Sequence, residues 1–96
     1  MAYDPGAIDA TLAAAVGEDH ALIAELRLAF VESAERCIAA LRAAEGAEAW
    51  RAAGLRLKGL AASFGAVRLM ALAEEVAATP HDMRLVARAE RALARF

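Results

Sequence analysis

Apolar side chains recur every three or four positions along most of the chain, which is the spacing that places residues on one face of an α-helix. Four longer segments carry this pattern, namely residues 20–44, 47–64, 66–78 and 79–96. Asp19 offers a capping carboxylate before the first of them. Gly46 breaks the pattern after the first segment, and Gly65 follows Phe64, where it either ends the second helix or bends it. Thr79-Pro80 supplies a cap and a first-turn proline for the last helix.

A fifth, shorter helix is expected at the start of the chain, from Asp4-Pro5 to about Ala15. Short connections between helices favour antiparallel neighbours. Alanine occupies 29 of the 96 positions and, with Leu, Arg and Glu, makes a composition of strong helix formers. We therefore predict an all-α protein with a single domain over residues 1–96. Its expected fold is an antiparallel four-helix bundle with a short N-terminal capping helix.

The segment 47–64 has two contrasting faces. Its large apolar side chains share one face, which should point inward: Trp50, Ala53, Leu57, Ala61 and Phe64. Leu55 lies about 200° around the axis from Leu57 at roughly 100° per residue, and so belongs to the outer face. Gly59 accompanies Leu55 there. A glycine inside a helix costs about 1 kcal/mol relative to alanine, so Gly59 suggests a place where another backbone comes close.

The same segment carries a motif. Leu57-Lys58-Gly59 is followed by Gly65-Ala66 and then by Leu69, Leu72 and Ala73. This resembles the signature of histidine phosphotransfer (HPt) domains, H-x-L-K-G, small residues, G-A and a further amphipathic helix, and the resemblance covers residues 4–78. It implies a helical bundle that carries a phosphoryl group on an exposed histidine, between receiver domains or from a kinase to a receiver. The position of that histidine is occupied by Leu55, which has no nitrogen to phosphorylate.

The resemblance therefore implies a signalling protein of phosphorelays that is not an enzyme. We expect a non-catalytic docking or inhibitory module that binds a response-regulator receiver domain or a histidine kinase. The expected partner-binding face holds Arg51, Leu55, Arg56, Lys58, Gly59 and Ala62. Lys58 is the only lysine and occupies the family's lysine position, from which it would meet the acidic pocket of a receiver; otherwise it is an ordinary surface cation. Leu55 is either a drifted surface position or an apolar contact, worth about 1.5–3 kcal/mol when buried by a partner.

Two alternatives stay open. An active phosphotransfer protein could use His20 or His81, each expected in the first turn of a helix, where a solvated surface residue is the plainer interpretation. A plain helical bundle could instead dimerise through an apolar helix face, whereas the docking module is expected to be monomeric.

Composition and charge limit the partners, cofactors and locations that the sequence allows. The net charge of −2, with both signs mixed along the chain, argues against nucleic acid as a partner. A cluster near the C-terminus, Arg84, Arg88, Arg91 and Arg95, is interpreted as a solvated helix face. The single Cys37 allows no internal disulfide and fits a small buried hydrophobe. With His20 and His81 it has no metal-ligand spacing, so no metal and no cofactor are expected. No signal peptide or membrane span is indicated, and a cytoplasmic location is expected.

Overall fold

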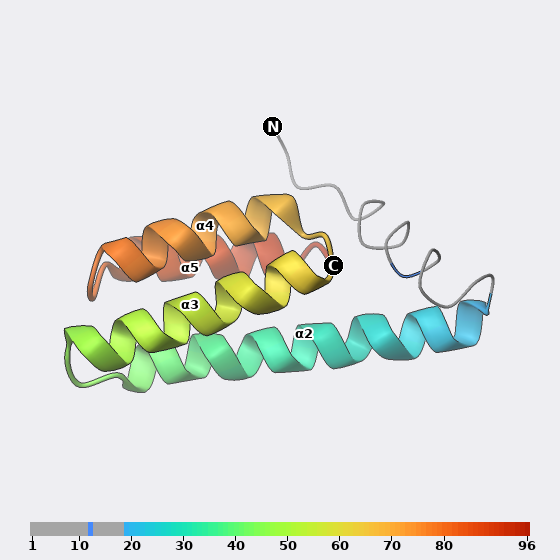
Figure 1. Cartoon of the computed structure of the whole chain (residues 1–96), viewed down its shortest axis with the longest axis horizontal. Helices are drawn as coiled ribbons and strands as arrows, with labels where there is room; N and C mark the ends of the chain where they lie inside the picture. The colour runs from blue at the N-terminus through green and yellow to red at the C-terminus, as the bar shows by residue number, and fades with distance from the viewer. Residues whose placement is uncertain (1–11, 13–18) are drawn as a thin grey trace.

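The computed structural model of the chain describes Leu12 and residues 19–96 (Figure 1). Every element in this part is a helix: α2 (His20–Ala43), α3 (Ala47–Ser63), α4 (Val67–Ala78) and α5 (Met83–Leu93). The predicted all-α fold with four longer helices is therefore confirmed. The expected capping helix from Asp4 to Ala15 falls outside the described residues, apart from Leu12, whose side chain is buried in the core.

The four helices run alternately up and down the bundle (Figure 1). α3 packs between α2 and α4, and α5 packs against both α4 and α2, so each helix has two neighbours. α2 is the longest helix, and its His20 end extends beyond the end of α3 (Figure 1). Among the helices that the structure describes, none combines the length and the apolar character needed to span a membrane.

The end of α3 is set by Gly65. The Gly65 N–H donates to the Ala62 carbonyl at 3.2 Å, and the Ala66 N–H donates to the Ala61 carbonyl at 2.9 Å. This pair of bonds is a Schellman motif, which requires a left-handed residue after the helix. Gly65 has that conformation, with φ of 71°. It therefore ends α3 rather than bending it, and the chain reverses into α4.

The start of α5 differs from the prediction. Asp82, rather than Thr79, is the N-cap, because its carboxylate accepts a hydrogen bond from the Arg84 N–H at 3.0 Å. Aspartate is a better capping residue than threonine. The Arg84 side chain also donates to this carboxylate and holds the pKa of Asp82 below its usual value. Pro80 and His81 consequently lie in the turn before the helix, and His81 adopts a φ of 61°.

The core is filled by large apolar side chains from all four helices. The largest fully buried ones are Trp50, Phe30, Leu41, Leu57, Leu69, Val76 and Val86. The Trp50 Nε1–H donates to the Val76 carbonyl at 2.6 Å, which satisfies the one polar group of the indole. The Phe30 ring lies 4.9 Å, between ring centroids, from both Phe64 and Phe96. Phe96 thus covers one end of the bundle.

Two apolar side chains at the starts of helices lie on the surface, and the cysteine lies inside. Val67 is 67% exposed and Met83 is also exposed. Each is the first residue of its helix, where the neighbouring helices no longer cover it. Cys37 is buried as predicted. Its burial raises the pKa of the thiol, an effect that the nearby guanidinium groups of Arg56 and Arg36 partly oppose.

Candidate functional site

The helix α3 separates its residues onto an inner and an outer face, as predicted. Trp50, Ala53, Leu57 and Ala61 are buried and Phe64 is half-buried. Leu55 is 42% exposed. The other residues predicted to bind a partner are exposed too, with Lys58 half-buried: Arg51, Arg56, Lys58, Gly59 and Ala62. We refer to these six outward residues, Leu55 included, as the α3 surface.

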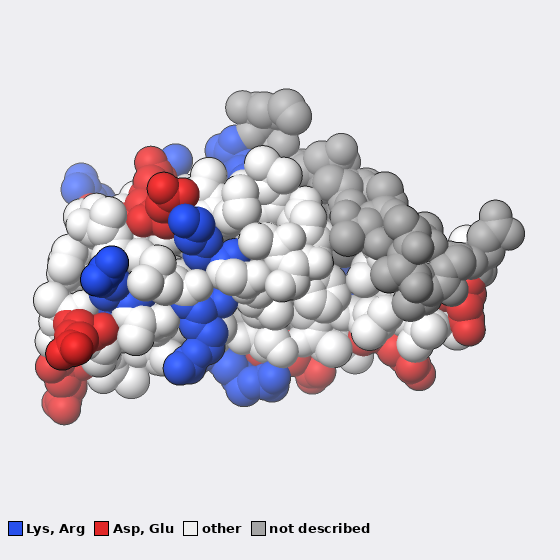
Figure 2. Space-filling model, viewed as in Figure 1, with Lys and Arg blue, Asp and Glu red and all other residues white. Residues whose placement is uncertain are grey.

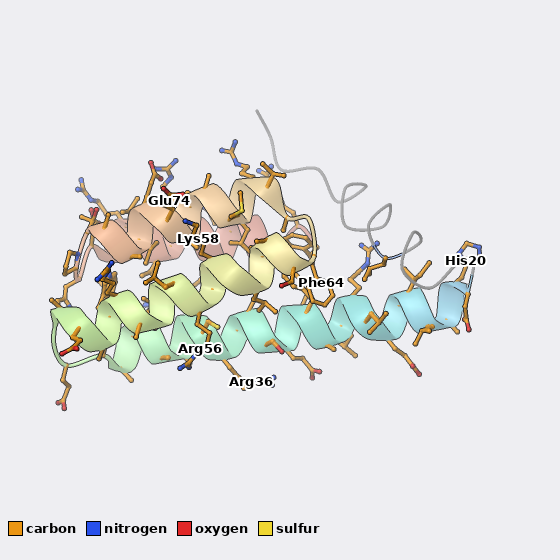
Figure 3. The ribbon with its side chains drawn as sticks, in the orientation of Figure 1. His20, Arg36, Arg56, Lys58, Phe64 and Glu74 are labelled. Carbon is orange, nitrogen blue, oxygen red and sulfur yellow. The ribbon has the colours of Figure 1, made fainter. Side chains whose placement is uncertain are left out.

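Positive charge flanks Leu55 on both sides of α3. Arg56 lies on the side of α2, close to Arg36, and Lys58 lies on the side of α4 (Figure 3). Seen from this side, the basic side chains form a band across the molecule that borders a broad uncharged area (Figure 2). A partner that covers Leu55 would therefore meet cations on either side of it. That arrangement favours an acidic partner.

Lys58 already has a carboxylate beside it. Its Nζ lies 3.4 Å from Oε2 of Glu74 on α4. An ion pair at the surface contributes only about 0–1 kcal/mol, so a carboxylate of a partner can take the place of Glu74 at little cost. The pair holds the ammonium group at the junction of α3 and α4. Sequence reasoning missed this contact because Glu74 belongs to another helix.

The glycine that permits a close helix contact is Gly54, not Gly59. A Cβ on Gly54 would lie 2.9 Å from both Cα and Cβ of Ala77, so α3 and α4 can approach this closely only without that atom. A Cβ on Gly59 would meet nothing within 4 Å. The close approach expected at Gly59 is therefore not made by the described part of the chain. The signal for Gly54 was its position four residues after Trp50, on the inward face.

Neither histidine belongs to the α3 surface. His20 is the first residue of α2 and lies at the end of the bundle remote from Lys58 (Figure 3). His81 is exposed in the turn between α4 and α5, where its ring centroid lies 5.1 Å from that of Trp50. It was predicted in the first turn of the last helix, and the later start of α5 corrects this. Within the described residues, no three His, Cys, Asp or Glu side chains come together as a metal site.

Comparison with protein-family models, with curated proteins and with solved structures gives no match for this chain. The resemblance to HPt domains therefore stays a prediction that depends on the motif around Lys58-Gly59. The helical bundle and the outward direction of Leu55 are structural findings that do not depend on it.

Proposed function

We propose that this protein is an HPt-like signalling module without an acceptor histidine. It binds the receiver domain of a response regulator, or the helical region of a histidine kinase, through the α3 surface. One observation carries the proposal: Leu55 and Gly59 stand exposed one turn apart in the middle of a helix. The described part of the chain gives Gly59 no packing role, although a helical glycine costs about 1 kcal/mol relative to alanine.

The α3 surface can serve docking through two kinds of contact. Burial of the Leu55 side chain in a partner's pocket would contribute about 1.5–3 kcal/mol. The absence of a side chain at Gly59 lets the partner's backbone approach the helix closely. Arg56 and Lys58 steer an acidic partner toward this contact, with Lys58 exchanging Glu74 for a carboxylate of the partner.

The missing imidazole defines what such docking can do. Leu55 offers no nitrogen to attack a phosphoryl group, so binding at this surface is not followed by transfer. The bound module instead occupies the partner's surface and competes with a phosphotransfer protein that carries the histidine. The proposed action is therefore inhibition or sequestration in the cytoplasm, by a monomer.

Titration of the protein with purified receiver domains, with the affinity measured by fluorescence anisotropy or calorimetry, tests this surface. We expect Leu55→Asp to weaken binding by roughly tenfold or more, because a charged group replaces the buried aliphatic one. The matched control is Leu28→Asp on α2, since Leu28 is also an exposed leucine, at 59%. This control should bind as the wild type does. Equal affinities for the wild type and Leu55→Asp would remove the α3 surface from the interface.

A labelling experiment tests the absence of transfer. The protein is incubated with a phosphorylated receiver or an active kinase and examined by mass spectrometry under conditions that preserve acid-labile phosphate. We expect no label. Both imidazoles are exposed, so either could accept a phosphoryl group. A label on His20 or His81 would overturn the proposal of an inhibitory module and would identify an active phosphotransfer protein.

A further inference from the structure

A surface groove between α4 and α5 is lined by four arginines. Its lining residues are Arg68, Leu72, Arg88, Arg91, Ala92 and Arg95, and its volume is about 180 Å³. Leu72 and Ala92 are buried and form the apolar part of the lining. None of the lining residues is acidic. The groove therefore concentrates positive charge in a protein whose net charge is −2.

The arginines come together because of helix geometry. Arg88 and Arg91 lie three residues apart on one face of α5, and Arg95, four residues after Arg91, follows just beyond the end of the helix at Leu93. Arg68, from the first turn of α4, joins them across the groove. Arg84, which belongs to the same sequence cluster, does not line the groove and pairs with the N-cap of its own helix. The groove thus joins Arg68 of α4 to three of the four arginines that the sequence clusters near the C-terminus, a combination that the sequence did not indicate.

These four side chains lack internal partners in the part of the chain that the structure describes. None of them forms a side-chain hydrogen bond or an ion pair there, whereas Arg42 pairs with Glu90. The negative end of the α5 dipole accounts for cations in its last turn. It does not account for Arg68, which lies in the first turn of α4, where the helix dipole disfavours a cation. Like charges held together in this way favour a bound anion.

We infer that this groove binds a compact ligand with two adjacent phosphate groups, such as inorganic pyrophosphate or the diphosphate of a nucleotide. The guanidinium group matches phosphate oxygens with two parallel hydrogen bonds. One phosphate group carries about −1.5 to −2 charges, so a single phosphate balances at most half of the four guanidinium charges. Two adjacent phosphates balance most of them.

The surroundings of the groove limit the length of the anion. The neighbouring groove shares Arg68 and Arg88 but is also lined by Glu74 and Glu75. A long polyanion or an anionic membrane surface that extended in this direction would meet these carboxylates. A diphosphate fits within the arginines alone. The α3 surface takes no part in this site, so the inference stands or falls independently of the proposed function.

Titration of the full chain with inorganic pyrophosphate, followed by NMR of backbone amides and by calorimetry, tests the site. Sulfate at the same ionic strength is the reference anion. We expect pyrophosphate to shift the amide signals of residues 68–72 and 88–95 and to bind roughly tenfold more tightly than sulfate, because it carries more negative charge. A nucleoside diphosphate that binds more tightly than pyrophosphate would identify the source as a nucleotide. Equal binding would identify it as the inorganic ion.

Two variants show whether the arginines are responsible. Arg88→Gln and Arg91→Gln should each weaken pyrophosphate binding by about ten- to a hundredfold, the range for a lost charge-assisted hydrogen bond. Their melting temperatures should change little, because in the described part of the chain these side chains form no hydrogen bond or ion pair that the change would remove. Arg51→Gln, at an exposed arginine of α3, is the matched control and should bind as the wild type does. Unchanged affinity in Arg88→Gln and Arg91→Gln, no preference over sulfate, or tighter binding to anionic vesicles than to pyrophosphate would each overturn the inference.

Discussion

Two glycines of α3, Gly54 and Gly59, occupy opposite situations in the same helix. Gly54 is buried against α4, where an added Cβ would lie 2.9 Å from the backbone of Ala77. Gly59 is exposed, and an added Cβ would meet nothing within 4 Å. Each glycine makes the helix less stable by about 1 kcal/mol than alanine would at the same position. At Gly54 the close packing of α3 and α4 offsets that cost, whereas at Gly59 the described structure offers no compensation.

The same division applies to the leucines beside them. Leu57 is fully buried among the other core residues, and Leu55, two positions earlier, is exposed. The inner face of α3 is thus explained by packing within this chain. The outer face combines an exposed aliphatic residue with a glycine that packing does not require. The two faces should therefore respond differently to substitution, and the effects below run from the largest to the smallest.

Truncation of Trp50 on the inner face should have the largest effect. Trp50→Ala removes a fully buried side chain and its hydrogen bond to the Val76 carbonyl. We expect a loss of about 3–5 kcal/mol in the free energy of unfolding, which is a large part of the 5–15 kcal/mol typical of such domains. Urea denaturation followed by circular dichroism measures it. Leu28→Ala, at an exposed position, is the control and should change stability by no more than about 0.5 kcal/mol. Similar losses in both variants would contradict the described core.

Substitution of Gly54 should have the next largest effect, with a sign opposite to that of helix propensity. Gly54→Ala places a methyl group against Cα and Cβ of Ala77, and α4 must shift to admit it. We expect a destabilisation of about 1–3 kcal/mol, the usual cost of overpacking, measured by the same denaturation experiment.

A second substitution tests this explanation of Gly54. Combining Gly54→Ala with Ala77→Gly removes the contact between the two Cβ atoms but leaves the Cα of Ala77 at 2.9 Å. The double variant should therefore recover only part of what Gly54→Ala alone loses, once the cost of Ala77→Gly by itself is subtracted. Gly54→Ala that stabilised the protein would show that α3 and α4 are not this close.

The sequence predicted those features of the fold that are determined by residues close together in the chain. The bounds of α2, α3 and α4 agree with the predicted ranges to within one residue, because Asp19, Gly46 and Gly65 mark their ends through local conformation. The outward direction of Leu55 followed from helical periodicity alone. The predicted start of α5 was wrong because Thr79-Pro80 and Asp82 both satisfy the capping rules. Only the folded turn shows that Asp82 receives the hydrogen bond.

What depends on contacts between helices could not be predicted in this way. The approach of Gly54 to Ala77 and the pair formed by Lys58 with Glu74 both join α3 to α4. The groove that brings Arg68 to the arginines of α5 is of the same kind. Periodicity assigns a residue to a face of its own helix but does not say which residue of another helix lies opposite. The candidate site was therefore predicted as a set of exposed residues, while its electrostatic surroundings required the structure.

Substitution of Gly59 should have the smallest effect on stability and separates the two faces most sharply. Gly59→Ala adds a methyl group in open space and removes backbone freedom from the unfolded chain, so the free energy of unfolding should rise by about 0.5–1 kcal/mol. The Ser63 hydroxyl, which donates to the Gly59 carbonyl at 2.9 Å, is not disturbed by this change. Denaturation with urea should thus give opposite signs for Gly59→Ala and Gly54→Ala.

Affinity for a receiver domain decides why a glycine stands at position 59. If the partner's backbone approaches α3 there, Gly59→Ala should bind more weakly even though it folds more stably, a combination that general damage to the fold cannot produce. Unchanged affinity, together with a loss in Leu55→Asp, would confine the docking contact to the turn around Leu55. A fall in stability would instead mean that Gly59 is packed in solution, contrary to its exposure here. Weaker binding would thus explain the glycine by a partner, and a fall in stability would explain it by packing within the fold. Unchanged affinity would leave it with neither explanation.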